Sequence, residues 1–596
     1  MKHKLRSRAL PVLLSFMLII GLMPTTVFAL EPVAPTTIQV NGTEILDSGN
    51  HTVSCGSGTA TYDPDTNTLT LDHAEIDYQQ NADLNSKGAI LFDGDLNINL
   101  VGENTITSVT CGIRGTNAGT LTITGDSLTI DSTYYGIGIP LTDANITIDG
   151  ADLDITAKGK GNFIGVGIQA GGVLSIKNGA YIDATDVSHH PIIGNAEIEI
   201  EDSTLYAQQY ANYGAAIRSD GEVSISNSTV EAKADSEGSS AIWTGNDLSS
   251  PPTSGNITIS DGSNVTLYSK TSNAVYAMLG TISISGSTVK AESFSGAYPT
   301  LCADGDIDIT NHSDVTVKSA DTIGIWSSGG AVMIQDSVAY VAAHDEWPAI
   351  RGDNGGATIS RSWVETFGSK VSPEFTSSDS VIFLSNEGTA SGSLTLPGDV
   401  IVGKDMQLSI PEGSSITVPA GVTFTNHGQI ELLGDLINNG GNIVCDSHSY
   451  EDGKCTICGA IDSSFKPVIT AGANGTWQRG TKDGLSFTSN AAFADFLKVQ
   501  VDGKDLDTSS YTVKEGSTIV TLKAEYLETL SEGKHTLAIV SETGTATTEF
   551  TVKAESTQTP QTGDSSNVML WLALLLVSGA GVSGAVMVIK KRRHIW

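Results

Sequence analysis

The chain has few basic residues, few aromatic residues and few cysteines for its length. Only 32 of its 596 residues are lysine or arginine, against 67 acidic residues, so the formal net charge is −35. A chain of this charge repels nucleic acids and anionic membrane surfaces, and neither is expected as a partner. Six cysteines are too few to hold such a chain together by disulfide bonds. The fold must therefore rest on packed strands.

The first residues have the pattern of an export signal. Basic residues between Lys2 and Arg8 precede an apolar run from Leu13 to Leu22, and Val27-Phe28-Ala29 follows. Small residues before a cleavage site suit signal peptidase, so residues 1–29 are predicted to be a signal peptide removed after Ala29. The alternative is an N-terminal membrane anchor, for which the apolar run is short.

The last residues carry three signals in order. An uncharged run from Val568 to Ile589 is long enough to cross a membrane as a helix, and the basic residues 590–593 would stay on the cytoplasmic side. The motif that precedes this run consists of Thr559, Pro560, Gln561, Thr562 and Gly563.

This order resembles the sorting signal of sortase substrates, whose usual pentapeptide is Leu-Pro-any-Thr-Gly. Thr559 replaces the leucine, which leaves the particular sortase open. The resemblance implies that the bond after Thr562 is cut and that Thr562 is joined to peptidoglycan, with the transmembrane helix kept only in the precursor. Sortase and peptidoglycan are then partners, and the location is the cell wall surface of a Gram-positive bacterium. The alternative is a membrane-anchored protein that keeps its helix.

A short repeat dominates the middle of the chain. Successive copies of an apolar–polar–apolar triplet are 25, 25, 28, 24, 25, 34, 25, 25, 25 and 25 residues apart. Random sequence does not keep such a spacing, so the chain contains an internal structural repeat. The triplets begin at Leu96, Leu121, Ile146, Leu174, Ile198, Val223, Ile257, Ile282, Ile307, Val332 and Ala357.

Each repeat has room for three short strands. Alternating residues such as 315–317 indicate half-buried strands, and Gly, Asn, Asp and Ser between them suit turns. Three strands and three turns in 25 residues predict one coil of a parallel β-helix, stacked on the next coil at about 4.8 Å. The longer steps are loop insertions, the clearest at residues 248–254. A β-sandwich is the competing fold, but it does not explain the constant period.

The repeat is flanked by weaker patterns. Residues 59–71 are expected in an N-terminal cap, and turns such as Pro397-Gly398 indicate shorter coils or a cap from 381 to 442. Residues 35–440 resemble the right-handed, pectate-lyase-like β-helix surface proteins of Gram-positive gut bacteria, which are often carbohydrate-binding. The resemblance implies a right-handed parallel β-helix and a glycan ligand.

The third strand of each coil offers a candidate binding face. One residue points inward, and the next must point outward because side chains alternate. The residues expected to point outward are Arg114, Pro140, Gln169, Ile193, Arg218, Trp243, Tyr276, Cys302, Trp326 and Arg351.

Part of this column forms a candidate ladder for ligand binding. Aromatic faces suit the C–H faces of sugars, and arginine donors suit hydroxyls or uronates. A covering loop or a protein contact is the alternative explanation for the same residues. The ladder residues are Arg218, Trp243, Tyr276, Trp326 and Arg351.

No residue is assigned a catalytic role. A lyase on this fold would need a Ca²⁺-binding carboxylate cluster and a base, and Arg218 or Arg351 would have to be that base. Carboxylates are abundant at residues 93–95, 149–152 and 304–308, but they lie at corners, where turns favour Asp. Calcium bound at such corners without catalysis is also open.

A cysteine and histidine cluster follows the coils. Cys445, His448, Cys455 and Cys458 form two ligand pairs, which together suit one tetrahedral zinc ion. A disulfide among these cysteines is the alternative outside the cell. In both cases the role is structural. Cys55 and Cys111 could form a further pair near the cap.

The segment from 463 to 554 changes character. Six alternating runs in about 90 residues predict an Ig-like β-sandwich. The stretch 520–530 resembles the Ig-like X-type module attached to bacterial cellulases and scaffolding proteins. That family is linked to polysaccharide or wall contact, and a simple stalk is the alternative.

The sequence thus predicts an all-β protein with a right-handed parallel β-helix solenoid, a small Ig-like β-sandwich and, in the precursor, a C-terminal transmembrane helix. The leading function is glycan binding or adhesion at the cell wall without catalysis. A Ca²⁺-dependent polysaccharide lyase or hydrolase and a purely structural surface protein are the alternatives. The expected order is signal peptide 1–29, N-terminal cap and first coil 30–94, parallel β-helix 95–370, short coils or cap 371–442, Cys/His knuckle 443–462, Ig-like domain 463–554, linker and sorting motif 555–563, and transmembrane helix with basic tail 564–596.

Overall fold

The structure is a computed structural model that describes residues 33–80, 87–160, 164–246, 252–368, 375–446, 448–515 and 517–556. These residues are almost entirely β-strand. Their helical elements are α2 (Ala524–Leu527) and two 3-10 turns, η1 (Phe493–Asp495) and η2 (Thr508–Ser510). The chain divides into two compact units, residues 1–447 and residues 448–596, here called the first and second units.

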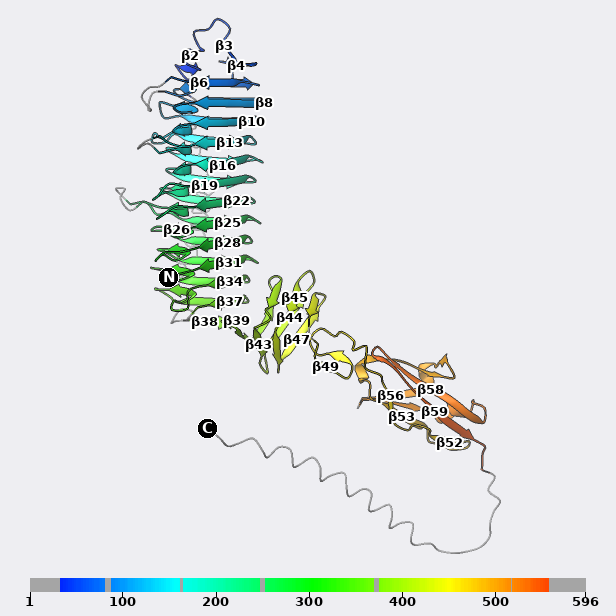
Figure 1. The fold of residues 1–596 in the computed structure, drawn as a ribbon. Coiled ribbons are helices and arrows are strands. Elements are labelled where there is room, and N and C mark those ends of the chain that lie inside the picture. Colours follow the sequence, from blue (N-terminus) through cyan, green and yellow to red (C-terminus); the bar gives the residue numbers. More distant parts are fainter. Residues whose placement is uncertain are drawn as a thin grey trace, which may run out of the picture. The chain divides into compact units, whose positions relative to one another are not determined.

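The first unit is a parallel β-solenoid, in which each coil adds one strand to each of three parallel sheets (Figure 1). The strand β8 (Leu96–Ser108) and the strand β10 (Thr120–Ser132) run through both sheet 1 and sheet 2.

Sheet 1 continues through β12 (Asn145–Asp149), β15 (Val173–Lys177), β18 (Glu197–Glu201), β21 (Glu222–Ser226), β24 (Ile257–Ser260), β27 (Ile282–Ser285), β30 (Ile307–Thr310), β33 (Val332–Gln335), β36 (Ala357–Ser360) and β38 (Phe375–Ser378). Sheet 2 contains β6 (Glu75–Tyr78), β13 (Asp152–Ala157), β16 (Tyr181–Val187), β19 (Thr204–Gln209), β22 (Thr229–Ala234), β25 (Asn264–Ser269), β28 (Thr288–Ser293), β31 (Asp314–Ser319), β34 (Val338–Ala342), β37 (Trp363–Phe367) and β39 (Ser380–Leu384). Sheet 3 contains β7 (Ile90–Phe92), β9 (Ile113–Gly115), β11 (Tyr135–Ile139), β14 (Val166–Ala170), β17 (His190–Gly194), β20 (Ala215–Ser219), β23 (Ser240–Thr244), β26 (Val275–Ala277), β29 (Leu301–Ala303), β32 (Ile325–Ser327) and β35 (Ile350–Gly352).

A column of buried isoleucines runs through sheet 1. The last residue of every predicted triplet is paired with the last residue of the next triplet, as Ile284 is with Ile309 and Ile309 with Ile334. The predicted parallel stacking of coils is confirmed, with the same residues in register. The column consists of Ile98, Ile123, Ile148, Ile176, Ile200, Ile225, Ile259, Ile284, Ile309, Ile334 and Ile359, all of them at most 1% exposed. Burying each such side chain contributes about 1.5–3 kcal/mol.

The corner between sheets 1 and 2 is held by a ladder of buried serines. The Ser313 hydroxyl donates to the Thr310 carbonyl at 2.6 Å and accepts from the Ser287 backbone N–H at 3.4 Å. The Ser313 N–H in turn donates to the Ser337 hydroxyl at 3.3 Å. The corner residue before the serine has a positive φ, as at Gly286 and Asp336, which explains why Gly, Asn and Asp recur there. The turn is therefore closed without leaving polar groups unpaired.

The N-terminal end of the first unit changes to antiparallel pairing. The strand β3 (Thr52–Cys55) pairs with β4 (Gly58–Asp63), and β4 pairs with β5 (Thr68–Asp72), which joins β8 in parallel. The strand β1 (Ile38–Val40) pairs antiparallel with β2 (Thr43–Glu44) and with β7. Cys55 and Cys111 are both buried, and the suggested pairing of these cysteines stays a prediction.

Shorter coils follow β39. The chain reverses into the antiparallel strand β40 (Glu387–Ser391), and three small parallel sets of strands then enclose a separate core that includes Trp363, Phe383 and Phe424. These sets are β40, β43 (Gln407–Ile410) and β46 (Gln429–Leu432); β41 (Ser393–Thr395), β44 (Ser415–Pro419) and β47 (Asp435–Asn439); and β42 (Val400–Val402), β45 (Thr423–Asn426) and β48 (Asn442–Cys445).

The second unit begins with a small hairpin and continues as two β-sheets around one core. Trp477, Phe487 and Phe550 are among the buried residues of that core. The Lys454 ammonium, on the hairpin, donates to Asp495 and Glu542 at 2.6 Å each, which ties the hairpin to the sheets. The strands are β49 (Tyr450–Glu451) and β50 (Lys454–Cys455) in the hairpin, β51 (Ile469–Ala471), β53 (Leu485–Ser489), β57 (Thr518–Leu522) and β56 (Tyr511–Lys514) in one sheet, and β52 (Thr476–Gln478), β59 (Gly544–Lys553), β58 (Gly533–Ser541), β54 (Phe496–Val501) and β55 (Lys504–Asp505) in the other.

Three predicted segments lie outside the described residues. They are the signal peptide at 1–29, the motif from Thr559 to Gly563, and the transmembrane helix within 564–596. Within the described ranges, the structure contains no apolar helix of membrane-spanning length.

The serine ladder can be tested by Ser313→Ala. We expect a loss of about 1–3 kcal/mol in the free energy of unfolding, because the buried Ser287 N–H would lose its acceptor. Denaturant unfolding measures this loss. Ser283→Ala is the matched control, since Ser283 faces outward on β27, and it should change stability by less than about 0.5 kcal/mol. Equal losses of unfolding free energy for the two substitutions would contradict the role of the serine ladder.

Candidate binding cleft and cysteine site

The five ladder residues lie in one column on sheet 3. Arg218 is paired with Trp243, Trp243 with Tyr276, and Trp326 with Arg351. Cys302 stands between Tyr276 and Trp326. Parallel pairing with every coil in register therefore brings together side chains that are up to 133 residues apart in the sequence.

Two details of the predicted column are wrong. Ile113 is paired with Ile137, so Gly138 rather than Pro140 stands beside Arg114. Both Ile137 and Ile139 of β11 are apolar and have the same alternation, which explains the error of two residues. Arg114, Ile193 and Cys302 are also buried rather than exposed.

The part of the column from Arg218 to Trp326 forms the floor of a cleft of about 520 Å³. This is within the range of sites that hold small ligands. One wall comes from the loops that precede the strands and includes Tyr213, Ser272, Asn273 and Tyr298.

Tyr213 and Tyr298 are the aromatic cleft residues that sequence reasoning missed. Their side chains are 76% and 55% exposed. They stand in loops without a strict period, so no alternation signals them. Gly238 supports Tyr213, since a Cβ at this residue would lie 2.7 Å from the Tyr213 ring. Its φ of +65° also favours glycine.

The aromatic rings of the floor interact with their neighbours in the column. The centroids of Trp243 and Tyr276 are 5.9 Å apart, with the rings tilted by 55°. The Arg218 guanidinium lies 5.6 Å from the Trp243 ring, and that of Arg351 lies 5.6 Å from the Trp326 ring. Part of the face of each tryptophan is therefore already in contact with an arginine, while Tyr213 and Tyr298 keep most of their surface open to solvent.

Both ladder arginines are paired with aspartates. Arg218 Nη2 lies 3.1 Å from Asp220, and Arg351 Nε lies 2.5 Å from Asp353. Asp353 also accepts from the Trp326 indole N–H at 3.2 Å. Each arginine is thus held in place and its charge is locally balanced.

Asp304 and Cys302 lie side by side at the cleft. Asp304 accepts from the Leu279 N–H at 2.9 Å and from the Ser328 hydroxyl at 3.0 Å. Burial, with a further contribution from the Asp304 charge, raises the pKa of the Cys302 thiol to about 12. Cys302 is therefore a neutral, unreactive thiol at physiological pH.

The carboxylates considered for calcium serve as acceptors in turns. Asp93 accepts from the Thr36 and Thr37 N–H groups, and Asp95 accepts from the N–H groups of Val33 and Thr120. In the described part of the chain, no three carboxylates lie close enough together to share one ion.

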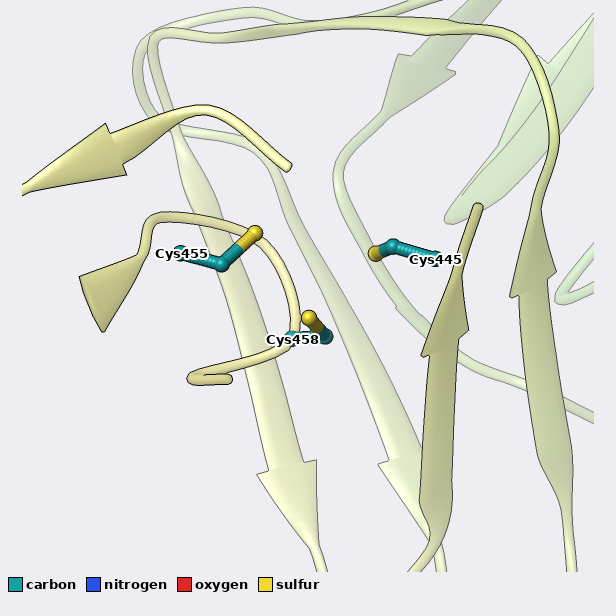
Figure 2. A group of neighbouring side chains, drawn as sticks. All are labelled: Cys445, Cys455 and Cys458. Carbon is teal, nitrogen blue, oxygen red and sulfur yellow. The ribbon is translucent and has the colours of Figure 1, made fainter. Parts of the chain in front are cut away.

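The predicted zinc ligands fall on both sides of the boundary between the two units. Figure 2 shows Cys445, at the end of β48 in the first unit, and Cys455 and Cys458, which belong to the second unit. Within the second unit, Cys458 Sγ lies 3.3 Å from His448 Nδ1. Two thiols and an imidazole gathered in this way match the donor set of zinc.

The Cys455 thiol is unusually acidic. Burial alone would raise its pKa, but the backbone N–H groups of Cys458 and Ile457 and the side chains of His448 and Cys458 outweigh burial and lower it to about 6. The thiolate is the form that binds a metal, and Cys455 is in that form at neutral pH.

The comparisons with known proteins add no family. No protein-family model and no curated protein matches this chain. The assignment of function therefore depends on the site itself.

The two pKa values predict different alkylation rates. In the reduced, metal-free protein at pH 7, Cys455 should react with iodoacetamide at least tenfold faster than Cys302, because only Cys455 is a thiolate. The rate at Cys455 should rise as the pH rises through about 6 and then level off. Peptide mass spectrometry measures both rates. Equal rates, or a Cys455 midpoint near the ordinary value of 9, would contradict the geometry described for this thiol.

Proposed function

We propose that this protein is a cell-wall-anchored surface protein that binds a glycan in the cleft of sheet 3 and does not cleave it. The observation that carries the proposal is the cleft itself, with its floor of Trp243, Tyr276 and Trp326 and its wall of Tyr213 and Tyr298. Extended aromatic surface with a few polar groups is the composition expected for sugar recognition, because sugar C–H faces pack on rings while hydroxyls need hydrogen-bond partners.

The direction of the cleft suits a linear polymer. Its floor residues come from consecutive coils, and each coil advances about 4.8 Å along the axis. This advance is comparable to one sugar unit, so neighbouring coils can contact neighbouring sugars. An adhesin gains from such a site because weak contacts repeated along a polymer add up.

The surface location is proposed from the sequence signals alone. Residues 1–29 would direct export, and sortase would join Thr562 to peptidoglycan. The right-handed sense of the solenoid and an Ig-like assignment for the two sheets of the second unit are part of the same proposal. In this arrangement the second unit is a stalk or a further wall-binding module.

We also propose that the four-residue set predicted from the sequence holds a structural zinc ion, to which His448, Cys455 and Cys458 of the second unit would contribute. The ion would supply no chemistry beyond cross-linking these residues, because four protein ligands leave no open position. The acidic thiol of Cys455 supports this proposal. Purified protein should contain one zinc per chain, and Cys455→Ser together with Cys458→Ser should abolish it.

The binding proposal is tested with the purified protein on a glycan array, followed by calorimetry with the best ligand. Trp243→Ala with Trp326→Ala should weaken binding at least tenfold, since two aromatic contacts are lost. Tyr213→Ala should weaken it severalfold. New ultraviolet absorbance from unsaturated products, or the release of shorter chains, would contradict the absence of catalysis.

Tyr181→Ala is the matched control. Tyr181 is a partly exposed aromatic residue that packs against Tyr206 at 5.8 Å on sheet 2, away from the cleft. Its loss should leave affinity within twofold of wild type. Binding that survives the double tryptophan substitution would reject this cleft as the glycan site.

A further inference from the structure

We infer that the cleft selects an uncharged, hydroxyl-rich glycan chain over uronates and other anionic glycans. The inference rests on the proposed glycan-binding function and names the class of ligand for that site. It narrows the expectation, based on sequence alone, that the ladder arginines donate to hydroxyls or uronates.

The arginines are already committed to partners within the protein. Arg218 is held by Asp220 at 3.1 Å and lies against the Trp243 ring. Arg351 is held by Asp353 at 2.5 Å and lies against the Trp326 ring. These side chains are only about a third exposed, so a ligand carboxylate would have to displace an aspartate from an existing ion pair. That exchange gains little, because one carboxylate replaces another.

Asp304 adds a negative charge to the same cleft. Its oxygens accept from three neutral donors, the Leu279 N–H, the Ser328 hydroxyl and the Tyr276 hydroxyl, the last at 3.4 Å. These hydrogen bonds fix the carboxylate without neutralising it. A carboxylate has about four lone-pair sites, so it can still accept from a sugar hydroxyl.

The charges of the cleft therefore sum to a negative value. Among the described residues that line it, Arg218 is the one cation and Asp304 the one anion. The neighbouring Asp220 already balances Arg218, so the charge of Asp304 is left over. The whole chain carries a net charge of −35, which adds long-range repulsion of anionic polymers at low salt. An uncharged polyol meets none of this repulsion and still finds acceptors at Asp304 and aromatic surface at Tyr213 and Tyr298.

The experiment compares length-matched neutral and acidic glycans on an array and then by calorimetry with the purified protein. The probes are linear hexasaccharides of glucose, mannose and xylose, and hexasaccharides of galacturonate and guluronate. We expect the best neutral probe to bind at least tenfold tighter than either uronate at about 0.01 M salt. Its affinity should change less than twofold between about 0.01 M and about 1 M salt, because no ligand charge is screened.

Asp304→Asn tests the residue that carries the inference. The substitution keeps an oxygen acceptor for the Leu279 N–H, places an amide NH2 that can donate to the Ser328 hydroxyl, and removes the charge, so uronate affinity should rise at least fivefold. Asp261→Asn is the matched control, because it removes the same charge at an exposed corner with positive φ, which Asn tolerates. Uronate affinity should then stay within twofold of wild type.

The outcomes separate this inference from the proposed function. Uronate binding that equals or exceeds neutral binding, and that weakens with salt, would overturn the inference while leaving glycan binding in place. The inference would also be overturned if Asp304→Asn raised uronate affinity no more than Asp261→Asn does. Binding of neither class would overturn the proposed function and the inference together.

Discussion

Parallel pairing of each coil with the next, in register, is the constraint on which the rest of the structure depends. The isoleucine column from Ile98 to Ile359 shows why this register is fixed. A slip by one residue would turn every buried isoleucine of a strand to the outside, and each exposure would cost about 1.5–3 kcal/mol. The serine ladder adds a second condition, because Ser313 satisfies the N–H of Ser287 only when the coils are aligned.

The same register creates the cleft. Side chains that share one position in successive coils must lie in a column, so Arg218, Trp243, Tyr276 and Trp326 come together without any long-range signal between them. The loops that precede these strands carry the wall residues Tyr213 and Tyr298. The solenoid thus supplies a rigid floor, and its loops supply the wall that gives the cleft its depth.

The sequence predicts what is periodic and misses what is not. The coils, their corners and the column of candidate ligand-binding residues on sheet 3 follow from alternation and spacing. Each of these features recurs at the same position in successive coils, so the pattern can be recognised many times over. The alternation places Pro140 rather than Gly138 in the column, since Ile137 and Ile139 both fit the pattern locally and only the pairing of Ile137 with Ile113 distinguishes them.

Tyr213 and Tyr298 could not be found from the sequence, because loop residues carry no period. The ion pairs of Arg218 with Asp220 and of Arg351 with Asp353 were also missed, although each pair is only two residues apart. Whether such neighbours meet depends on side-chain rotamers, which a pattern does not specify. These two ion pairs matter for the proposed ligand, because an arginine that is already paired with an aspartate gains little from binding a uronate carboxylate.

Disulfide trapping tests the register most directly. Thr258 and Ser283 are paired on neighbouring coils of sheet 1, at a spacing within the range that a disulfide spans. Thr258→Cys with Ser283→Cys should therefore cross-link readily on oxidation, while Thr258→Cys with Ser285→Cys, two residues out of register, should cross-link far less. Equal cross-linking of the two pairs, or none for the in-register pair, would contradict the stacked coils on which this account rests.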